Sequence, residues 1–272
     1  MMMPPMSANV EKTIFWTMIH PSAFVHPQAK VHETAVVGPW SLVDAGAEIA
    51  EGVVLESRVH VYGGVSVGKN THIFDGAILG GPPQDLKYAG EPTRLEIGEN
   101  CTIREYCTLN RGTVQGGGCT RVANKVLVMA YSHIAHDCDI REGAVIANSC
   151  QLGGHVRIGE YATIGGVTAI QQRNQVGAYA FVGGTHKVDR DVPPCTKASG
   201  NPIRYGALNL HALRLHPEKF PEERVKALSR AYRELYRGAR PVAEIIEELK
   251  NGPEPLFRDF FDEHWGGTLV RP

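Results

Sequence analysis

Aliphatic residues recur at every sixth position through most of the chain. One series of Val, Ile and Leu runs from Val25 to Leu79, resumes in the same register at Ile97, and ends at Leu109. A second series, shifted by one residue, runs over 122–188, so 25 positions are aliphatic without a polar exception. The fourth residue after each aliphatic is almost always small or β-branched. A period of six fits neither a helix with 3.6 residues per turn nor a plain alternating strand.

This period is typical of a parallel β-helix, in which three hexads form one triangular coil of 18 residues. We predict a mainly β prism over residues 18–200, with the sixth residues pointing inward and the small residues packed at the bends. Its coils stack at the roughly 4.8 Å spacing of paired strands. Residues 80–96 and 110–121 interrupt the repeat with Gly, Pro and charged residues. We expect both to form loops on one side of the prism, where solenoids often bind ligands.

The two ends of the chain lack the repeat. Residues 201–272 are rich in helix formers, and prolines open three predicted helices from Pro221, over 241–250 and over 253–265. We therefore expect a C-terminal helical domain over 201–272. Residues 1–17 continue no pattern and lack the basic and apolar regions of a signal peptide, so we expect a disordered extension.

Composition excludes several classes of protein. A formal net charge of −1 argues against a nucleic-acid binder that is attracted by bulk charge. The apolar runs fall far short of the roughly 20 residues that a membrane span needs. The six cysteines form no CxxC pair, which indicates reduced thiols in a cytoplasmic protein rather than a disulfide scaffold or zinc ribbon.

Residues 18 apart stack above one another, which brings polar residues together. Two neighbouring columns carry them: His136, Gly154 and Gln172 in one, and Asp137, His155 and Arg173 in the other. A histidine bonded to an aspartate is held in one tautomer and can remove a proton from a hydroxyl group. A glycine N–H one coil further can stabilise a developing oxyanion. A single histidine is more often a solvated surface residue, so spacing alone leaves both interpretations open.

Five motifs narrow the choice: QDLKYAGEPT (84–93), NRGTVQGGG (110–118), HIAHDC (133–138), LGGHV (152–156) and DVPP (191–194). In this order on hexapeptide coils they closely resemble the UDP-N-acetylglucosamine acyltransferases of lipid A biosynthesis. The resemblance begins near Met18 and weakens past Tyr205. It implies a left-handed coil, unlike the usual right-handed crossover, and a homotrimer with active sites between subunits. It also implies transfer of a 3-hydroxyacyl chain from acyl carrier protein to the sugar 3-hydroxyl, without a metal or other cofactor.

The resemblance also implies roles for single residues. His136 would be the general base, Asp137 would support it, and the N–H of Gly154 would bind the oxyanion. Gly184 falls where the family sets acyl length, and the missing side chain predicts room for a long chain. Substrate contacts are implied for Asp85, Lys87, His133, His155, Gln172 and Asn209, with Arg214 the nearest candidate for the nucleotide phosphates.

Three positions depart from the family pattern, since Asn110 and Gln171 replace a common histidine and His211 replaces a glutamate. They leave open an acceptor with an amine at the sugar 3-position. Alternatives on the same scaffold are an acetyl-CoA-dependent transferase and a non-catalytic scaffold protein. A further alternative is a γ-carbonic-anhydrase-like enzyme with zinc on three histidines, 133, 136 and 155. The acidic carrier protein requires a basic docking surface, for which the candidates are Arg157, Arg173 and Lys187.

Overall fold

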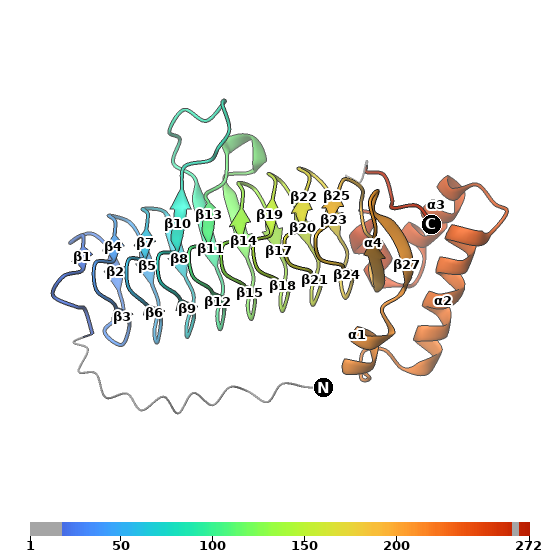
Figure 1. The fold of residues 1–272 in the computed structure, drawn as a ribbon, viewed down its shortest axis with the longest axis horizontal. Coiled ribbons are helices and arrows are strands. Elements are labelled where there is room, and N and C mark those ends of the chain that lie inside the picture. The colour runs from blue at the N-terminus through green and yellow to red at the C-terminus, as the bar shows by residue number, and fades with distance from the viewer. Residues whose placement is uncertain (1–17, 263–266) are drawn as a thin grey trace.

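The computed structural model describes residues 18–262 and 267–272, so the extension expected over 1–17 lies outside the described residues. The described chain winds into a long triangular prism of stacked coils, with helices packed at its C-terminal end (Figure 1). None of the described helices is long and apolar enough to span a membrane.

Each face of the prism is one sheet of short parallel strands, and successive strands of the chain pass from sheet to sheet. The first sheet contains β1 (Phe24–Val25), β4 (Leu42–Val43), β7 (His60–Val61), β10 (Ile78–Gly81), β13 (Thr108–Asn110), β16 (His133–Ile134), β19 (Gln151–Leu152), β22 (Ala169–Ile170) and β25 (Lys187–Val188). The second contains β2 (Lys30–Val31), β5 (Glu48–Ile49), β8 (Val65–Val67), β11 (Arg94–Ile97), β14 (Cys119–Val122), β17 (Asp139–Ile140), β20 (Arg157–Ile158) and β23 (Gln175–Val176). The third contains β3 (Val36–Val37), β6 (Val54–Leu55), β9 (His72–Ile73), β12 (Thr102–Ile103), β15 (Leu127–Val128), β18 (Val145–Ile146), β21 (Thr163–Ile164), β24 (Phe181–Val182), β26 (Thr196–Ser199) and β27 (Arg204–Leu208).

The core of the prism consists of the sixth-position aliphatics. All of them are buried except Val25 and Val31 in the first coil, which are partly buried against the same cluster. Burying each side chain contributes about 1.5–3 kcal/mol before the conformational entropy of folding is subtracted. The cysteines at the bends are buried and unpaired. The predicted inward register is confirmed.

The edge between the first and second sheets differs from the other two edges. Residues 82–93 connect β10 to β11 and residues 111–118 connect β13 to β14, so both loops leave the prism at this edge. We call it the histidine edge, because His136 and His155 lie at its turns. The second loop is shorter than the predicted 110–121, because β13 extends to Asn110 and β14 begins at Cys119.

The C-terminal segment covers the end of the prism. β27 returns antiparallel along β26, so the predicted boundary between residues 200 and 201 falls between two paired strands. The described residues then form the helices α1 (Leu210–Leu215), α2 (Glu222–Arg237), α3 (Val242–Asn251) and α4 (Pro255–Phe260). α1 was not predicted, and α4 ends earlier than the predicted 253–265. A second cluster of aromatic and aliphatic side chains, which includes Tyr179, Tyr232 and Phe257, packs the helices onto the last coils.

Candidate active site

His136 and Asp137 form a hydrogen-bonded pair at a turn of the histidine edge. His136 Nδ1 lies 2.7 Å from Asp137 Oδ2, and the Asp137 side chain is only 1% exposed. A carboxylate accepts the proton of Nδ1–H, which leaves Nε2 of the neutral ring as a proton acceptor. The sequence-predicted base and its supporting carboxylate are therefore in contact.

The second loop holds the Asp137 carboxylate in place. The backbone N–H of Thr113 donates to Oδ1 at 2.7 Å, and the Thr113 hydroxyl donates to Oδ2 at 2.6 Å. A side chain at Gly116 would collide with this carboxylate, since a Cβ there would lie 2.0 Å from Asp137 Cγ. The glycine-rich loop contains a 3-10 turn over Val114–Gly116, with Thr113 as its N-cap. No periodic signal in the sequence marks the place of Thr113.

Gly154 lies directly beside the His136 ring. A Cβ at Gly154 would come within 2.6 Å of His136 Cε1 and 2.7 Å of Nε2, so only glycine leaves room for the imidazole in this position. The Gly154 N–H donates to no other group among the described residues. Gly154 therefore carries an unpaired N–H next to the His136 ring, and such an N–H can stabilise a developing oxyanion.

The columns stack as the 18-residue period predicts. The N–H of His155 donates to His136 O, and the N–H of Arg173 donates to Gly154 O, both at 2.9 Å. Asp137, His155 and Arg173 all have left-handed backbone conformations, with φ between +59° and +67°. Gln172, on the next coil, has its backbone against Gly153 and an exposed side chain.

Two further histidines surround the pair. His155 Nε2 lies 3.7 Å from Asp137 Oδ2, and its ring meets that of His136 edge-on at 5.2 Å between centroids. Burial lowers the pKa of His155, while the carboxylates of Asp137 and Asp85 oppose this shift. His133 Nδ1 lies 2.7 Å from the Thr108 hydroxyl, and burial lowers its pKa too. Both rings therefore favour the neutral form at neutral pH.

The shifted pKa of His133 predicts a pH-dependent stability. Because the pKa is lower in the folded chain than its ordinary value of 6.5, the unfolded chain binds more protons as the pH falls through that value. Stability is therefore lost on acidification. We expect His133→Asn to show a smaller fall in Tm than the wild type between about pH 7.5 and 5.5. His211→Asn, at an exposed histidine of α1, is the control and should fall like the wild type.

The first loop brings acidic and basic groups near this cluster. Asp85 Oδ1 accepts a hydrogen bond from the Lys87 N–H at 2.9 Å. Asp85 is half-buried, its charge acts on the His155 ring, and the Lys87 side chain is exposed. Asn110, at the base of the second loop, is buried and donates from Nδ2 to Gly81 O and Pro82 O. Asn110 therefore ties the end of β13 to the end of β10 and to the first residue of the first loop.

Other predicted site residues lie elsewhere within one chain. Asn209 is buried at the N-terminus of α1, where its Nδ2 donates to Tyr179 O at 2.9 Å and its Oδ1 accepts from Ala212 N. Arg214 is exposed on α1. Gly184 lies at the edge between the third and first sheets, not at the histidine edge. One chain thus assembles the catalytic cluster but does not bring these three residues to it.

One of the three candidates for the basic docking surface is already ion-paired. Arg157, a candidate for carrier-protein docking, pairs with Asp262 at 2.6 Å, so its charge is already compensated.

Ligand atoms of His136, Asp137 and His155 lie within 4.8 Å of one another and could hold a metal ion. This trio differs from the three-histidine set considered above, because Asp137 takes the place of His133.

Solved structures of known enzymes superpose on almost the whole chain. The UDP-N-acetylglucosamine O-acyltransferase (LpxA) of Moraxella catarrhalis RH4 is 37% identical, with a TM-score of 0.88 over 94% of this chain and 100% of its own. The chain belongs to the UDP-N-acetylglucosamine O-acyltransferase family. LpxA of Acinetobacter baumannii is 33% identical with a TM-score of 0.87, covering 93% of this chain and 100% of its own. The acyltransferase of Francisella novicida is 31% identical with a TM-score of 0.88, covering 94% of each chain.

A family model agrees with these superpositions. The model described as "Udp N-acetylglucosamine O-acyltransferase; Domain 2" matches residues 191–264, which include the C-terminal helices. Membership of the acyltransferase family confirms the resemblance drawn from the five motifs. It also confirms the predicted fold class, a left-handed parallel β-helix with a C-terminal helical domain.

Proposed function

We propose that this protein transfers a 3-hydroxyacyl chain from acyl carrier protein to the 3-hydroxyl of UDP-N-acetylglucosamine, the first step of lipid A biosynthesis. The observation that carries the proposal is the buried His136–Asp137 pair beside the unpaired Gly154 N–H, in a chain of this acyltransferase family. The arrangement supplies a base and an oxyanion donor, and among the described residues no serine or cysteine hydrogen-bonds to the base. Direct transfer between two bound substrates follows from it.

The proposed reaction needs one proton acceptor that later becomes a donor. His136 Nε2 takes the proton of the sugar 3-hydroxyl as its oxygen attacks the thioester carbonyl carbon. The negative charge that develops on the carbonyl oxygen is stabilised by the N–H of Gly154. The carbon–sulfur bond then breaks, the ester forms, and the departing thiolate takes the proton back from His136. Asp137 stabilises the transient imidazolium and keeps the ring in position.

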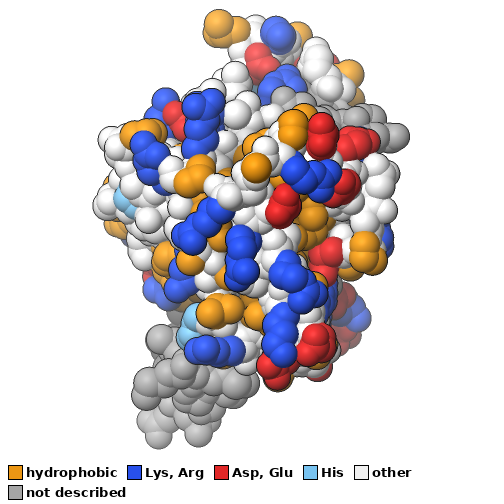
Figure 2. Space-filling model, turned by 90° about the vertical axis from the view of Figure 1, so that its right-hand side faces the viewer, with side chains coloured by type: hydrophobic (Ala, Val, Ile, Leu, Met, Phe, Trp, Pro, Cys, Tyr) orange, Lys and Arg blue, Asp and Glu red, His pale blue; other side chains and the backbone are white. Residues whose placement is uncertain are grey.

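The acyl donor is proposed to be acyl carrier protein in the cytoplasm, with no other cofactor. An acidic carrier protein needs basic groups where it docks. Figure 2 shows the C-terminal end of the molecule, where Lys and Arg side chains gather with fewer acidic ones. Exposed basic residues on α2 that form no ion pair with the described residues are Arg230, Arg233 and Arg237. They join Arg173 and Lys187 as proposed docking residues, because Lys187 lies 4.0 Å from Asp189 whereas Arg157 is held at 2.6 Å by Asp262.

We propose a homotrimer because the residues proposed to bind the substrates lie on different edges of a single chain. Gly184 lies on a different edge from His136, so a neighbouring prism would have to present its own third-to-first edge to the histidine edge. Large apolar side chains are exposed along that third-to-first edge, including Trp40, Tyr106, Tyr131 and Val167. Sedimentation equilibrium of the full chain tests this, and a monomer mass at assay concentration would contradict it.

The decisive assay offers the purified protein UDP-N-acetylglucosamine with either 3-hydroxyacyl carrier protein or acetyl-CoA. We expect turnover with the carrier-bound donor alone, unchanged after treatment with a chelator. Turnover only with acetyl-CoA, or loss of turnover on chelation, would reject the proposal. A parallel arm with the 3-amino sugar nucleotide tests whether Asn110, Gln171 and His211 select an amine acceptor.

Gly184 predicts a preference for long acyl chains. A Cβ at this position would lie 3.0 Å from Gly166 O of the preceding coil, so a larger side chain would be crowded there. We infer that it would take up part of the space that the acyl chain occupies. We expect Gly184→Leu to lower kcat/KM for the best wild-type donor by about 10-fold or more, since excluding a methylene costs that much. Competition between donors of different length measures it, and an unchanged length preference would contradict the assignment.

A further inference from the structure

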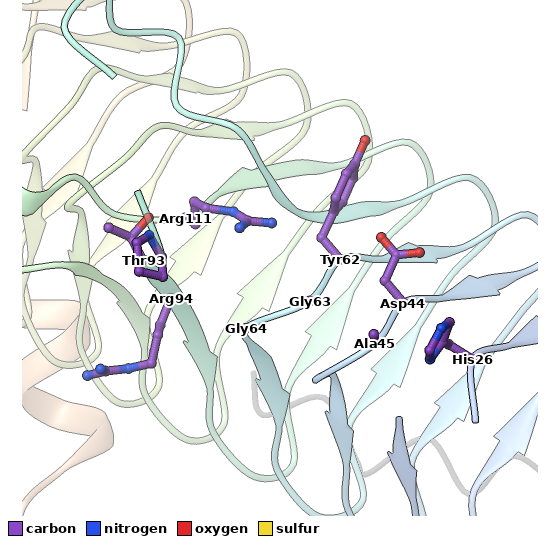
Figure 3. Close-up of a pocket in the computed structure, with 10 residues that line it drawn as sticks. His26, Asp44, Ala45, Tyr62, Gly63, Gly64, Thr93, Arg94 and Arg111 are labelled. Atoms are coloured by element: carbon purple, nitrogen blue, oxygen red, sulfur yellow. The ribbon is translucent and has the colours of Figure 1, made fainter. Parts of the chain in front are cut away.

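The edge between the second and third sheets carries a cluster of aromatic and charged side chains that the proposed reaction does not use. Tyr161 and Tyr179 lie at turns of successive coils on this edge, and their rings stack at 5.4 Å between centroids. This edge lies opposite the first sheet, whose two edges would meet neighbouring chains in the proposed trimer. The hollow beside Tyr62 and Arg111, by contrast, lies at the histidine edge (Figure 3) and faces a neighbouring chain in that trimer.

Lys219, in the connection between α1 and α2, places its ammonium group in this cluster. Nζ lies 2.8 Å from the Tyr179 hydroxyl oxygen, 3.9 Å from Glu160 Oε2 and 5.0 Å from the centroid of the Tyr161 ring. A hydroxyl acceptor, a carboxylate and the face of an aromatic ring all stabilise a cation. The ring of His216, the residue after α1, packs on Tyr161 at 4.6 Å between centroids. The chain that leaves α1 is therefore anchored on the prism.

Tyr179 is bonded to both ends of the segment 209–219, which contains α1. Its carbonyl oxygen accepts a hydrogen bond from Asn209 Nδ2 at 2.9 Å, and its hydroxyl accepts one from Lys219 Nζ. Tyr179 is buried, and its ring meets that of Phe220 edge-on at 4.8 Å. α1 has only 6 residues, and helices shorter than about 12–15 residues are marginal on their own. The position of α1 therefore depends on contacts such as these.

Arg214 lies in the last turn of α1, between the two contacts to Tyr179. Its side chain is exposed and forms no ion pair with the described residues, so its charge is available to a phosphate. We propose, on the basis of the proposed function, that Lys219 is a positioning residue. By holding the C-terminal end of α1 on Tyr179, it orients Arg214 toward the nucleotide phosphates. Without the ammonium group, α1 loses one of its two bonds to Tyr179, and fewer molecules present Arg214 in the binding position.

Steady-state transfer to UDP-N-acetylglucosamine by Lys219→Met tests the proposal. Methionine nearly keeps the length of the side chain but removes its charge and its hydrogen-bond donor. We expect the KM for the sugar nucleotide to rise about 10-fold, which corresponds to a fall of the binding-competent fraction to about one tenth. The kcat should stay unchanged, because the lost interaction is made equally in the ground state and the transition state. Tyr179→Phe removes only the hydroxyl group and should raise the same KM by less, since Glu160 and Tyr161 still face the ammonium group.

Further variants separate positioning from a general loss of structure. Lys219→Arg keeps a cation and a hydrogen-bond donor and should restore the wild-type KM. Adding Lys219→Met to Arg214→Gln should raise the KM no further, because Lys219 acts through Arg214. Lys125→Met is the matched control: this lysine lies on the same edge of the prism but pairs with Glu142 at 2.8 Å rather than with Tyr179. Its KM should equal that of the wild type.

An unchanged KM in Lys219→Met, a fall in kcat alone, or a double variant whose losses multiply would each overturn the proposal. Calorimetric titration of the full chain with UDP requires no turnover, so it separates this proposal from the proposed function. An inactive wild type that binds UDP, with about 10-fold weaker binding in Lys219→Met, would reject the transfer reaction and retain the role of Lys219. A wild type that binds no UDP would overturn both.

Discussion

Replacing His136 with alanine is expected to lower kcat by about 10²–10⁴-fold, the contribution of a positioned general base. KM for the sugar nucleotide should change little, because in the proposed mechanism the ring acts only on the reacting hydroxyl. The measurement is steady-state transfer from 3-hydroxyacyl carrier protein. His72→Ala is the matched control: this histidine lies on the third sheet, paired with Glu56, and its loss should leave kcat unchanged.

The hydrogen bond between His136 and Asp137 allows a sharper test of the same assignment. Asp137→Asn removes the carboxylate that holds the ring, so it should lower kcat strongly on its own. If the two residues act as one unit, the double variant should be no slower than His136→Ala. Multiplied losses in the double variant would show that His136 is not the base that Asp137 supports.

Replacing Gly154 with alanine is expected to lower kcat by about 100-fold or more while leaving the N–H of residue 154 in place. The new Cβ would lie 2.6 Å from His136 Cε1, so the ring has to move, and a displacement of about 1 Å at a catalytic group costs roughly 100-fold. The overpacking itself should reduce stability by only about 1–3 kcal/mol. Transfer kinetics and thermal melting of the same preparation separate the two effects.

Gly206→Ala is the matched control for this steric argument. It adds the same methyl group in β27, where a Cβ would lie 3.3 Å from Lys197 O, away from the histidine edge. Its kcat should equal that of the wild type. Wild-type kcat in Gly154→Ala would mean that the His136 ring does not need the observed position, and the assignment of Gly154 would be wrong.

Much of the fold could be predicted because the sequence repeats itself. A constant step of six residues places Leu55 and Ile73 in the same inward position in successive coils, and both are buried as expected. The same constancy predicted that His136, Gly154 and Gln172 would stack. Prediction failed where the period ends: α1 was missed, and α4 ends at Phe260, because no repeat marks the ends of these helices.

The sequence by itself determined the prism, its core and the stacking of Gly154 on His136, because the constant period makes each of these a matter of spacing along the chain. Only the tertiary structure decided what surrounds them. Thr113 reaches Asp137 across 24 residues, and Arg157 reaches Asp262 across 105. These contacts depend on loop and helix conformations that no repeat specifies. The contact of Thr113 holds the carboxylate that orients His136 at the histidine edge.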